Sequence, residues 1–368
     1  MKLHSMSAVC TMVVVLAVAM SGVSGREPGE GGKFAGSTWV SVGPGGGGFQ
    51  HFPSISPFDT QLYFVACDMG GFYRSTDRGL TWRMNPEIDH VTSPAIFHPT
   101  DSDVVYVFQT YGQEFEHGWR LWRSNDKGAT WKPLHEYIGP YNTNYGTCLA
   151  IDPARPMWLM AGMGGSLPGK ILLSTNGGKF FTQVDKDIPK EADVINLVMD
   201  LKTKPGMRTI YAATTQGMYA STDDGKTWGL MPSQPGDGKM THFSACQNPQ
   251  TGDTVFFAVT PITMNDGKAT GGLFKSGDFG KTWEQLTDKV LAGAQGKPTK
   301  PRFRSPAVNY AKPEIVYLAV DGEGIDRDGA YKSVDGGLHG STCCPAMRTT
   351  NLSMGRSAVK AVKLKRGG

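Results

Sequence analysis

Short apolar runs alternate with turn-forming residues along most of this chain. Six runs of strand length follow one another and read LYFVAC, DVVYVFQ, MWLMAG, TIYAAT, TVFFAVT and IVYLAV. Turn signals such as HPTDSD, DPARP and NPQTGD precede several of them, and helical periodicity is nearly absent. Runs rich in β-branched and aromatic residues that are bounded in this way predict β-strands.

One motif recurs after each apolar run. It begins as STDRGLTW at Ser75, SNDKGATW at Ser124, STNGGKFF at Ser174, STDDGKTW at Ser221, SGDFGKTW at Ser276 and SVDGGLHG at Ser333. The copies start 47 to 57 residues apart, and a period of this size predicts repeated supersecondary units. Each unit contains four strand patterns. We therefore predict an all-β fold, a β-propeller of six to seven four-stranded antiparallel blades.

The motif is predicted to form the turn between the third and fourth strands of each blade. There an Asp side chain can accept hydrogen bonds from backbone N–H groups, a glycine supplies a positive φ, and the Trp buries its ring between blades. Repetition argues against the alternative, five equivalent catalytic carboxylates. The carboxylates predicted to be structural are Asp77, Asp126, Asp223, Asp278 and Asp335.

The opposite face of the propeller should carry the loops that follow the second strand of each blade. We expect Asp68 there, at the end of the first apolar run. The same face should gather the segments 110–119, 137–146, 163–169, 260–272 and 321–329. These segments are long, polar and aromatic, as binding loops tend to be. Candidate sugar-stacking platforms are Tyr111, Trp119, Tyr141 and Tyr145, and the alternative for each is that its ring fills a gap between blades.

The chain ends differ from the repeats. Residues 1–25 combine a basic start, an apolar run and small residues, which predicts a signal peptide and a secreted, periplasmic or extracellular protein. Residues 26–36 are expected to be a linker and 37–340 the propeller. Within it, STWVSVG at 37–43 is predicted to be a detached fourth strand that completes the last blade. Residues 341–368 form an atypical basic tail, interpreted as disordered or as a truncated sequence, with truncation favoured because the repeat breaks mid-motif.

Charge and cysteine content narrow the function classes. The net charge of +4 includes six basic residues and no acid in 341–368, and Lys2 in the leader, which leaves −3 for residues 26–340. A mildly acidic body argues against nucleic acid as a partner, and no segment after the leader is apolar for long enough to span a membrane. Cys67, Cys148 and Cys246 lie in apolar runs and are expected to be buried thiols. No metal-binding spacing is present, and we predict no metal and no cofactor.

The recurring motif is the Asp-box, or BNR, repeat of sialidases, sortilin-type receptors and some glycoside hydrolases. Residues 36–135 resemble, more narrowly, the start of glycoside hydrolase family 74 xyloglucanases, which carry a G-G-G-G-[FY] segment and then a strand ending in Asp-x-Gly-Gly-x-Tyr-Arg. TWVSVGPGGGGF and LYFVACDMGGFYRS match these features. The resemblance implies that Asp68 is a catalytic base. The remaining matched positions are Gly70, Gly71, Tyr73 and Arg74, and the first three are candidates for substrate binding.

The resemblance also implies a partner acid. Inverting glycosidases place an acid and a base roughly 6.5–9.5 Å apart, and family 74 enzymes take the acid from a second seven-bladed propeller, which this chain lacks. Candidate substitutes are Asp321 and Glu323 in DGEGIDRDG, and Glu114. Alternatively, the acidic segment is a solvated loop or binds Ca²⁺.

Two classes of function follow. The first is a glycoside hydrolase that acts on a β-glucan or xyloglucan-type polysaccharide. The second is a non-catalytic propeller that binds glycan or protein and is sialidase-like by fold only. Sialidase chemistry itself is disfavoured, because the Arg-Ile-Pro that begins its arginine cluster is missing and Arg302 to Pro306 is a poor substitute. A third interpretation is an inactive remnant produced by truncation.

Overall fold

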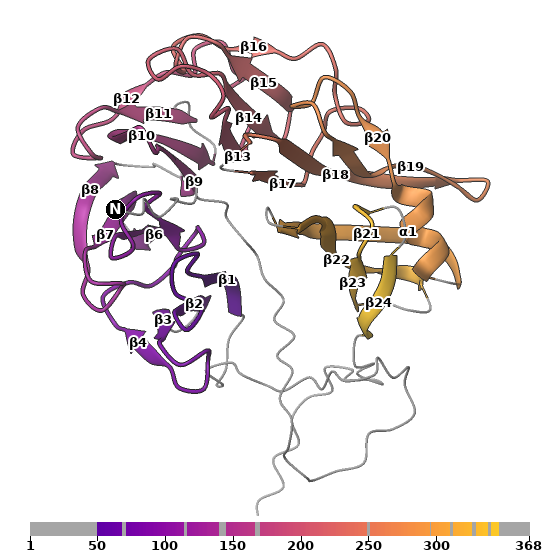
Figure 1. Cartoon of the computed structure of the whole chain (residues 1–368), viewed down its shortest axis with the longest axis horizontal. Helices are drawn as coiled ribbons and strands as arrows, with labels where there is room; N and C mark the ends of the chain where they lie inside the picture. Colours follow the sequence, from indigo (N-terminus) through magenta and orange to yellow (C-terminus); the bar gives the residue numbers. More distant parts are fainter. Residues whose placement is uncertain are drawn as a thin grey trace, which may run out of the picture.

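Six four-stranded sheets and one short helix make up the fold of this protein. The computed structural model describes residues 50–67, 71–113, 116–139, 145–165, 170–248, 251–294, 296–309, 312–325, 329–337 and 340–345. Each sheet is antiparallel and consists of four consecutive strands. In Figure 1 the sheets follow one another around an arc, with the first strand of a sheet toward the centre and the fourth toward the outside. The chain is therefore an all-β propeller with six blades in its described part.

The first three sheets are formed by the N-terminal half of the chain. Sheet 1 consists of β1 (Gln50–Ile55), β2 (Tyr63–Cys67), β3 (Gly71–Ser75) and β4 (Arg83–Asn85). Sheet 2 consists of β5 (Ile96–Phe97), β6 (Val105–Gln113), β7 (Glu116–Ser124) and β8 (Lys132–Gly139). Sheet 3 consists of β9 (Tyr145–Asp152), β10 (Arg155–Gly164), β11 (Ile171–Ser174) and β12 (Thr182–Gln183).

The last three sheets repeat this plan. Sheet 4 consists of β13 (Val194–Met199), β14 (Ile210–Thr214), β15 (Gly217–Ser221) and β16 (Gly229–Leu230). Sheet 5 consists of β17 (His242–Gln247), β18 (Thr254–Asn265), β19 (Lys268–Ser276) and β20 (Glu284–Gln285), and α1 (Thr287–Ala294) follows it. Sheet 6 consists of β21 (Gly296–Asn309), β22 (Lys312–Ile325), β23 (Gly329–Ser333) and β24 (Gly340–Pro345).

The same register recurs in every sheet. The serine that opens each Asp-box pairs with one residue of the second strand, and these partners are Tyr63, Val105, Leu159, Ile210, Phe256 and Val316. Because successive side chains of a strand point to opposite faces, the register decides which apolar residues face each neighbouring sheet. In sheet 5, for example, Phe256 packs toward sheet 4 and Phe257 toward sheet 6.

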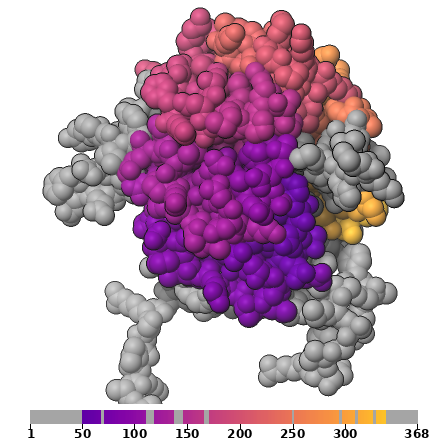
Figure 2. All heavy atoms as spheres, turned by 60° about the vertical axis from the view of Figure 1, so that its left-hand side comes forward, coloured from indigo at the N-terminus to yellow at the C-terminus, as the bar shows by residue number. Residues whose placement is uncertain are grey.

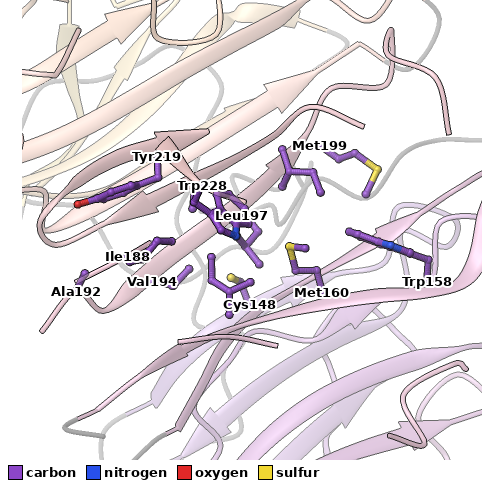
Figure 3. Close-up of a cluster of buried hydrophobic side chains, with 13 residues drawn as sticks. Cys148, Trp158, Met160, Ile188, Ala192, Val194, Leu197, Met199, Tyr219 and Trp228 are labelled. Carbon is purple, nitrogen blue, oxygen red and sulfur yellow. The ribbon is translucent and has the colours of Figure 1, made fainter. Parts of the chain in front are cut away.

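Five apolar clusters join the six sheets in sequence. Each cluster combines two consecutive sheets, and Figure 3 shows the one between sheets 3 and 4, where Trp158 and Met160 meet Val194 and Trp228. In the space-filling view of Figure 2 the atoms of the N-terminal sheets run together from indigo to magenta. Burial of these apolar faces between blades is the main stabilising contribution to such a fold.

The face of sheet 6 that is turned away from sheet 5 is less buried than the faces that pack between two sheets. In the described residues no cluster combines sheet 6 with sheet 1, and the two sheets stand at the ends of the arc (Figure 1). Phe257 and Val259 of sheet 5 are fully buried against sheet 6. Their counterparts Tyr317 and Ala319 in sheet 6 are partly buried and exposed, respectively. The described interfaces therefore leave one side of the sixth blade uncovered by another apolar sheet.

The last blade is completed differently from the expectation. The fourth position of sheet 6, predicted for residues 37–43, is taken by β24, which pairs with β23 from Gly329 to Ser333. A strand edge can pair with only one strand, so this position is filled from the C-terminal side. Residues 37–43 lie outside the described residues, and the boundary expected at residue 340 falls inside β24.

Two smaller expectations can be compared with the structure. Cys67, Cys148 and Cys246 are buried free thiols, as predicted, and burial raises the pKa of the Cys148 thiol to about 11. In the part of the chain that the structure describes, no helix has the length and apolar character needed to cross a membrane.

Candidate functional site

The Asp-box turns and the turns between first and second strands lie on the same face of the propeller. Backbone hydrogen bonds join the two kinds of turn directly, and in sheet 1 the Arg78 N–H donates to the Gln61 carbonyl at 3.1 Å. Equivalent bonds occur in sheets 2, 3, 4 and 6, for example from the Lys127 N–H to the Asp103 carbonyl. The connection after each second strand therefore leaves from the opposite face, which is the face of the candidate site.

Asp77 shows what the repeated carboxylate does. Its Oδ1 accepts hydrogen bonds from the Ser75 hydroxyl at 2.7 Å and the Thr81 N–H at 2.8 Å, and its Oδ2 accepts the Thr81 hydroxyl at 2.5 Å. These bonds, with those of Thr81 foremost, hold the pKa of Asp77 at about 2. A carboxylate whose oxygens are engaged within its own turn has no oxygen directed at a substrate, so Asp77 braces the turn.

The other copies keep this geometry with small departures. Burial raises the pKa of Asp223, but hydrogen bonds from Thr227, Ser221 and Lys226 outweigh it and hold the value at about 2. The same opposing causes lower the pKa of Asp126 and of Asp278. Asp335 accepts the Ser333 hydroxyl at 2.6 Å. In the third copy an asparagine, Asn176, takes the same position and accepts the Phe180 N–H at 3.0 Å through its side-chain oxygen.

The hairpin of β2 and β3 brackets the candidate base. Cys67 pairs with Gly71, and Asp68 and Gly70 lie between them in sequence, outside the described residues. Gly71 has a φ of 106°, and a Cβ at this position would stand 3.0 Å from the Asn85 carbonyl oxygen and 3.2 Å from that of Ile88. Only glycine fits this conformation without strain, which explains the Gly71 position of the motif.

Tyr73 and Arg74 point to opposite faces of sheet 1. Tyr73 pairs with Val65 and Met84, on the face turned away from sheet 2, where it is partly exposed. The Arg74 Nε donates to the Lys127 carbonyl at 2.7 Å, in the Asp-box turn of sheet 2. Arg74 thus connects the first two blades, and Tyr73 is the member of the motif with an accessible ring.

Asp321 and Glu323 lie in a hairpin that continues sheet 6. The sequence predicted a loop at 321–329, whereas β22 extends to Ile325 and pairs with β21. The Arg302 Nε stands 2.7 Å and the Arg304 Nε 3.4 Å from the two oxygens of Asp321, and the Lys300 Nζ lies 3.0 Å from a Glu323 oxygen. Cross-strand cations therefore engage both carboxylates, in an exposed setting where such pairs contribute little to stability.

Trp119 is the one candidate sugar-stacking platform whose side chain the structure describes. Its ring is only 3% exposed and lies in the cluster between sheets 2 and 3, with ring centroids 5.9 Å from Phe108 and 6.2 Å from Phe181. A stacking platform needs an exposed ring face, so the structure favours the gap-filling alternative for Trp119. Glu114 and Tyr141 lie outside the described residues, and the side chains of Tyr111 and Tyr145 are likewise not described.

A buried lysine on the same face escaped the sequence reasoning. Lys170 is fully buried, and its Nζ lies 2.9 Å from Asp193 Oδ1 and also donates to the Gly165 carbonyl. Asp193 accepts the Gly165 N–H as well, at 2.9 Å. This ion pair ties the loop of sheet 3 to the entry of sheet 4. The only signal was a lysine directly before an apolar strand, which is too common to single out.

The described residues were also compared with the requirements of a metal site. Among those residues, no group of three or more His, Cys, Asp and Glu side chains stands close enough to hold an ion.

Comparison with known proteins gives a consistent picture. The BNR-Asp box repeat family matches residues 273–286, which cover the end of β19, the Asp-box turn that follows it and β20. A xyloglucanase of Acetivibrio thermocellus is 25% identical over 329 residues, which span 80% of this chain and 38% of that protein. An oligoxyloglucan-reducing end-specific xyloglucanase of Emericella nidulans is 24% identical over 79% of this chain and 40% of its own length.

Solved structures agree with the fold. A GH74 xyloglucanase from Xanthomonas campestris superposes with a TM-score of 0.60 at 21% identity, over 83% of this chain and 46% of that one. A GH74 enzyme of Niastella koreensis gives a TM-score of 0.59 at 18% identity over 82% and 46%. This chain thus spans less than half the length of these relatives. It is an Asp-box propeller similar to those of GH74 enzymes.

Proposed function

We propose that this chain is a glycoside hydrolase-like propeller that acts on a xyloglucan-type polysaccharide, with Asp68 as the general base. One observation carries the proposal: CDMGGFYR joins two strands on the face opposite the Asp-box turns, in a chain of which 80% aligns with a xyloglucanase. The strict requirement for glycine at Gly71 supports it, because that residue sets the path of the hairpin next to Asp68.

In this proposal Asp68 removes a proton from water, which attacks the anomeric carbon and inverts its configuration. The leaving oxygen must receive a proton from an acid on the other side of the scissile bond, roughly 6.5–9.5 Å from the base. The cross-strand pairing of Asp321 and Glu323 with Arg302 and Lys300 argues against either as that acid. Glu114 or a carboxyl group of a second propeller is the better source, since the relatives are about twice as long.

Secretion belongs to the same proposal. A substrate that is a cell-wall-type polysaccharide is met outside the cell, and the leader-like residues 1–25 fit export. These residues lie outside the described part of the structure.

A second function is favoured by one observation. If the ion pairs of Asp321 and Glu323 persist and no further carboxyl group reaches the site, the chain alone binds glycan without cleaving it. In this alternative the loop face and its aromatic residues bind the glycan, but no glycosidic bond is hydrolysed.

Hydrolysis and retention can be measured on the same preparation. We expect the full chain to release reducing ends from xyloglucan and to be retarded in a gel that contains it, with unsubstituted cellulose derivatives as the comparison polysaccharide. Asp321→Asn should leave the rate of release nearly unchanged, whereas Glu114→Gln should abolish it if Glu114 is the acid. Retardation without any release of reducing ends would support the binding propeller, and neither effect would contradict both functions.

A further inference from the structure

A cavity of about 390 Å³ opens between the outer strand of sheet 1 and the Asp-box turn of sheet 2. Its lining includes Phe72 and Trp131, whose rings meet edge to face with centroids 5.7 Å apart. Both rings are nearly buried and form an apolar floor. The volume falls in the range of pockets that hold small molecules, roughly 300–1,000 Å³. The cavity is lined by β3, by β4 and the residues that follow it, and by the Asp-box turn of sheet 2.

Two arginines stand side by side in this cavity. Arg74 and Arg83 pair directly across β3 and β4, so their side chains lie on the same face of sheet 1, and both line the cavity. Among the described residues neither forms an ion pair with a carboxylate, and the Arg74 Nε is fixed by the Lys127 carbonyl. This bond leaves the terminal nitrogens of Arg74 as donors toward the cavity.

The two guanidiniums offer paired donors to an anion in the cavity. Like charges directly opposite one another across two strands are destabilising. Burial is the main cause that lowers the pKa of the Arg74 guanidinium; Asp126 opposes it, Arg83 adds to it and Asp59 opposes it. Asp126 itself is occupied within its turn by Thr130 and Ser124. A carboxylate bound between the two guanidiniums would accept paired hydrogen bonds from both.

The other polar groups of the cavity favour a hydroxylated ligand with a single negative charge. Glu87 and Asn85 also line the cavity, and Asn85 Oδ1 accepts the Glu87 N–H at 2.8 Å. The Glu87 carboxylate disfavours a doubly charged ion such as phosphate, but it can accept hydrogen bonds from hydroxyl groups. A sugar acid combines one carboxylate with several hydroxyls and an apolar C–H face. Each feature has a counterpart in the cavity.

We propose that the cavity between sheets 1 and 2 is a binding site for a sugar acid of the hexuronate type, with its carboxylate between Arg74 and Arg83. The site goes beyond the proposed hydrolytic function and does not depend on it. On a polysaccharide-acting protein it would hold an acidic substituent of the polymer.

The test uses sodium D-glucuronate as the probe, titrated into the full-length protein and followed by calorimetry or by chemical shifts. D-Glucose is the neutral comparison ligand and sulfate the comparison anion. We expect glucuronate to bind and glucose to bind much more weakly. Arg83→Gln should weaken glucuronate binding roughly tenfold or more, because it removes hydrogen bonds between charged groups. Glu87→Gln should strengthen it.

Arg78→Gln is the matched control. Arg78 is an exposed arginine of the neighbouring Asp-box turn that does not line the cavity, so the loss of its charge should leave glucuronate affinity nearly unchanged. Melting temperatures verify that each variant folds, and Arg83→Lys, which keeps the charge but loses the fork of donors, is the second variant. Equal binding of glucose and glucuronate, equal losses of affinity in Arg83→Gln and Arg78→Gln, or sulfate binding as tight as glucuronate would overturn the proposal.

Discussion

Two aspartates nine positions apart, Asp68 and Asp77, illustrate how little residue type says about role. Both carboxylate oxygens of Asp77 accept hydrogen bonds from Ser75 and Thr81 within one turn. Asp68 directly follows β2 in the sequence, and β2 ends on the face opposite the Asp-box turns. Repetition of the motif was enough to predict the structural role of Asp77 from the sequence. The role of Asp68 rests on a resemblance, and it stays a prediction.

Acid should weaken the fold through the Asp-box carboxylates. The pKa of Asp223 falls from 3.8 to about 2 on folding, so its contribution is complete above about pH 4 and is lost as the pH falls toward 2. We expect Asp223→Asn to lower the free energy of unfolding by about 1 kcal/mol at neutral pH, after allowance for partial exposure. The difference from wild type, measured by urea unfolding, should shrink toward zero near pH 2.

Glu191→Gln provides the comparison for this pH series. Glu191 is exposed and belongs to no Asp-box turn, and its one ion pair among the described residues is with Lys190 at 3.9 Å, so Glu191→Gln should leave the pH dependence of unfolding as in the wild type. A difference between wild type and Asp223→Asn that stays constant with pH would contradict the assigned role of the carboxylate.

The sequence predicted individual strands and hairpins better than any other feature of the structure. Apolar runs, turn residues and the fixed motif predicted four strands per unit, and the serine of each motif meets the second strand in one register throughout. The hairpin at Asp321 was not predictable, because DGEGI has the glycine and acid content of a loop. Its partners Lys300 and Arg302 are about twenty residues earlier, and only pairing of β21 with β22 brings the charges together.

Gly71 offers a test at this scale. Gly71→Ala forces a Cβ against two backbone carbonyl oxygens at a φ of 106°, so we expect a loss of roughly 1–3 kcal/mol in the free energy of unfolding. Gly229→Ala is the matched control, since Gly229 lies in a strand and a Cβ there would meet no atom within 4 Å. Equal stability of the two variants in urea unfolding would show that the hairpin next to Asp68 is not constrained as described.

At the scale of the whole molecule, the blades were predictable and their closure was not. Five apolar interfaces follow from five pairs of consecutive sheets, because neighbours in sequence are neighbours in space. The strand expected to complete the last blade was assigned to residues 37–43, but β24 occupies that edge. Pairing between strands that are far apart in the sequence depends on which strand lies next to the free edge of a sheet. The local pattern of apolar and polar residues contains no such information. The chain also aligns with only 38% of the length of the Acetivibrio thermocellus xyloglucanase.

The most direct measurement compares turnover and stability in Asp68→Asn and Asp77→Asn, two variants whose positions flank β3 in the sequence. With xyloglucan as substrate, we predict that Asp68→Asn loses at least roughly a hundredfold in the rate of reducing-end release while its melting temperature stays at the wild-type value. Asp77→Asn should lower the melting temperature and keep most of the turnover per folded molecule. Full activity in Asp68→Asn, or a wild-type protein that releases no reducing ends from xyloglucan, would contradict the assignment of Asp68 as the base.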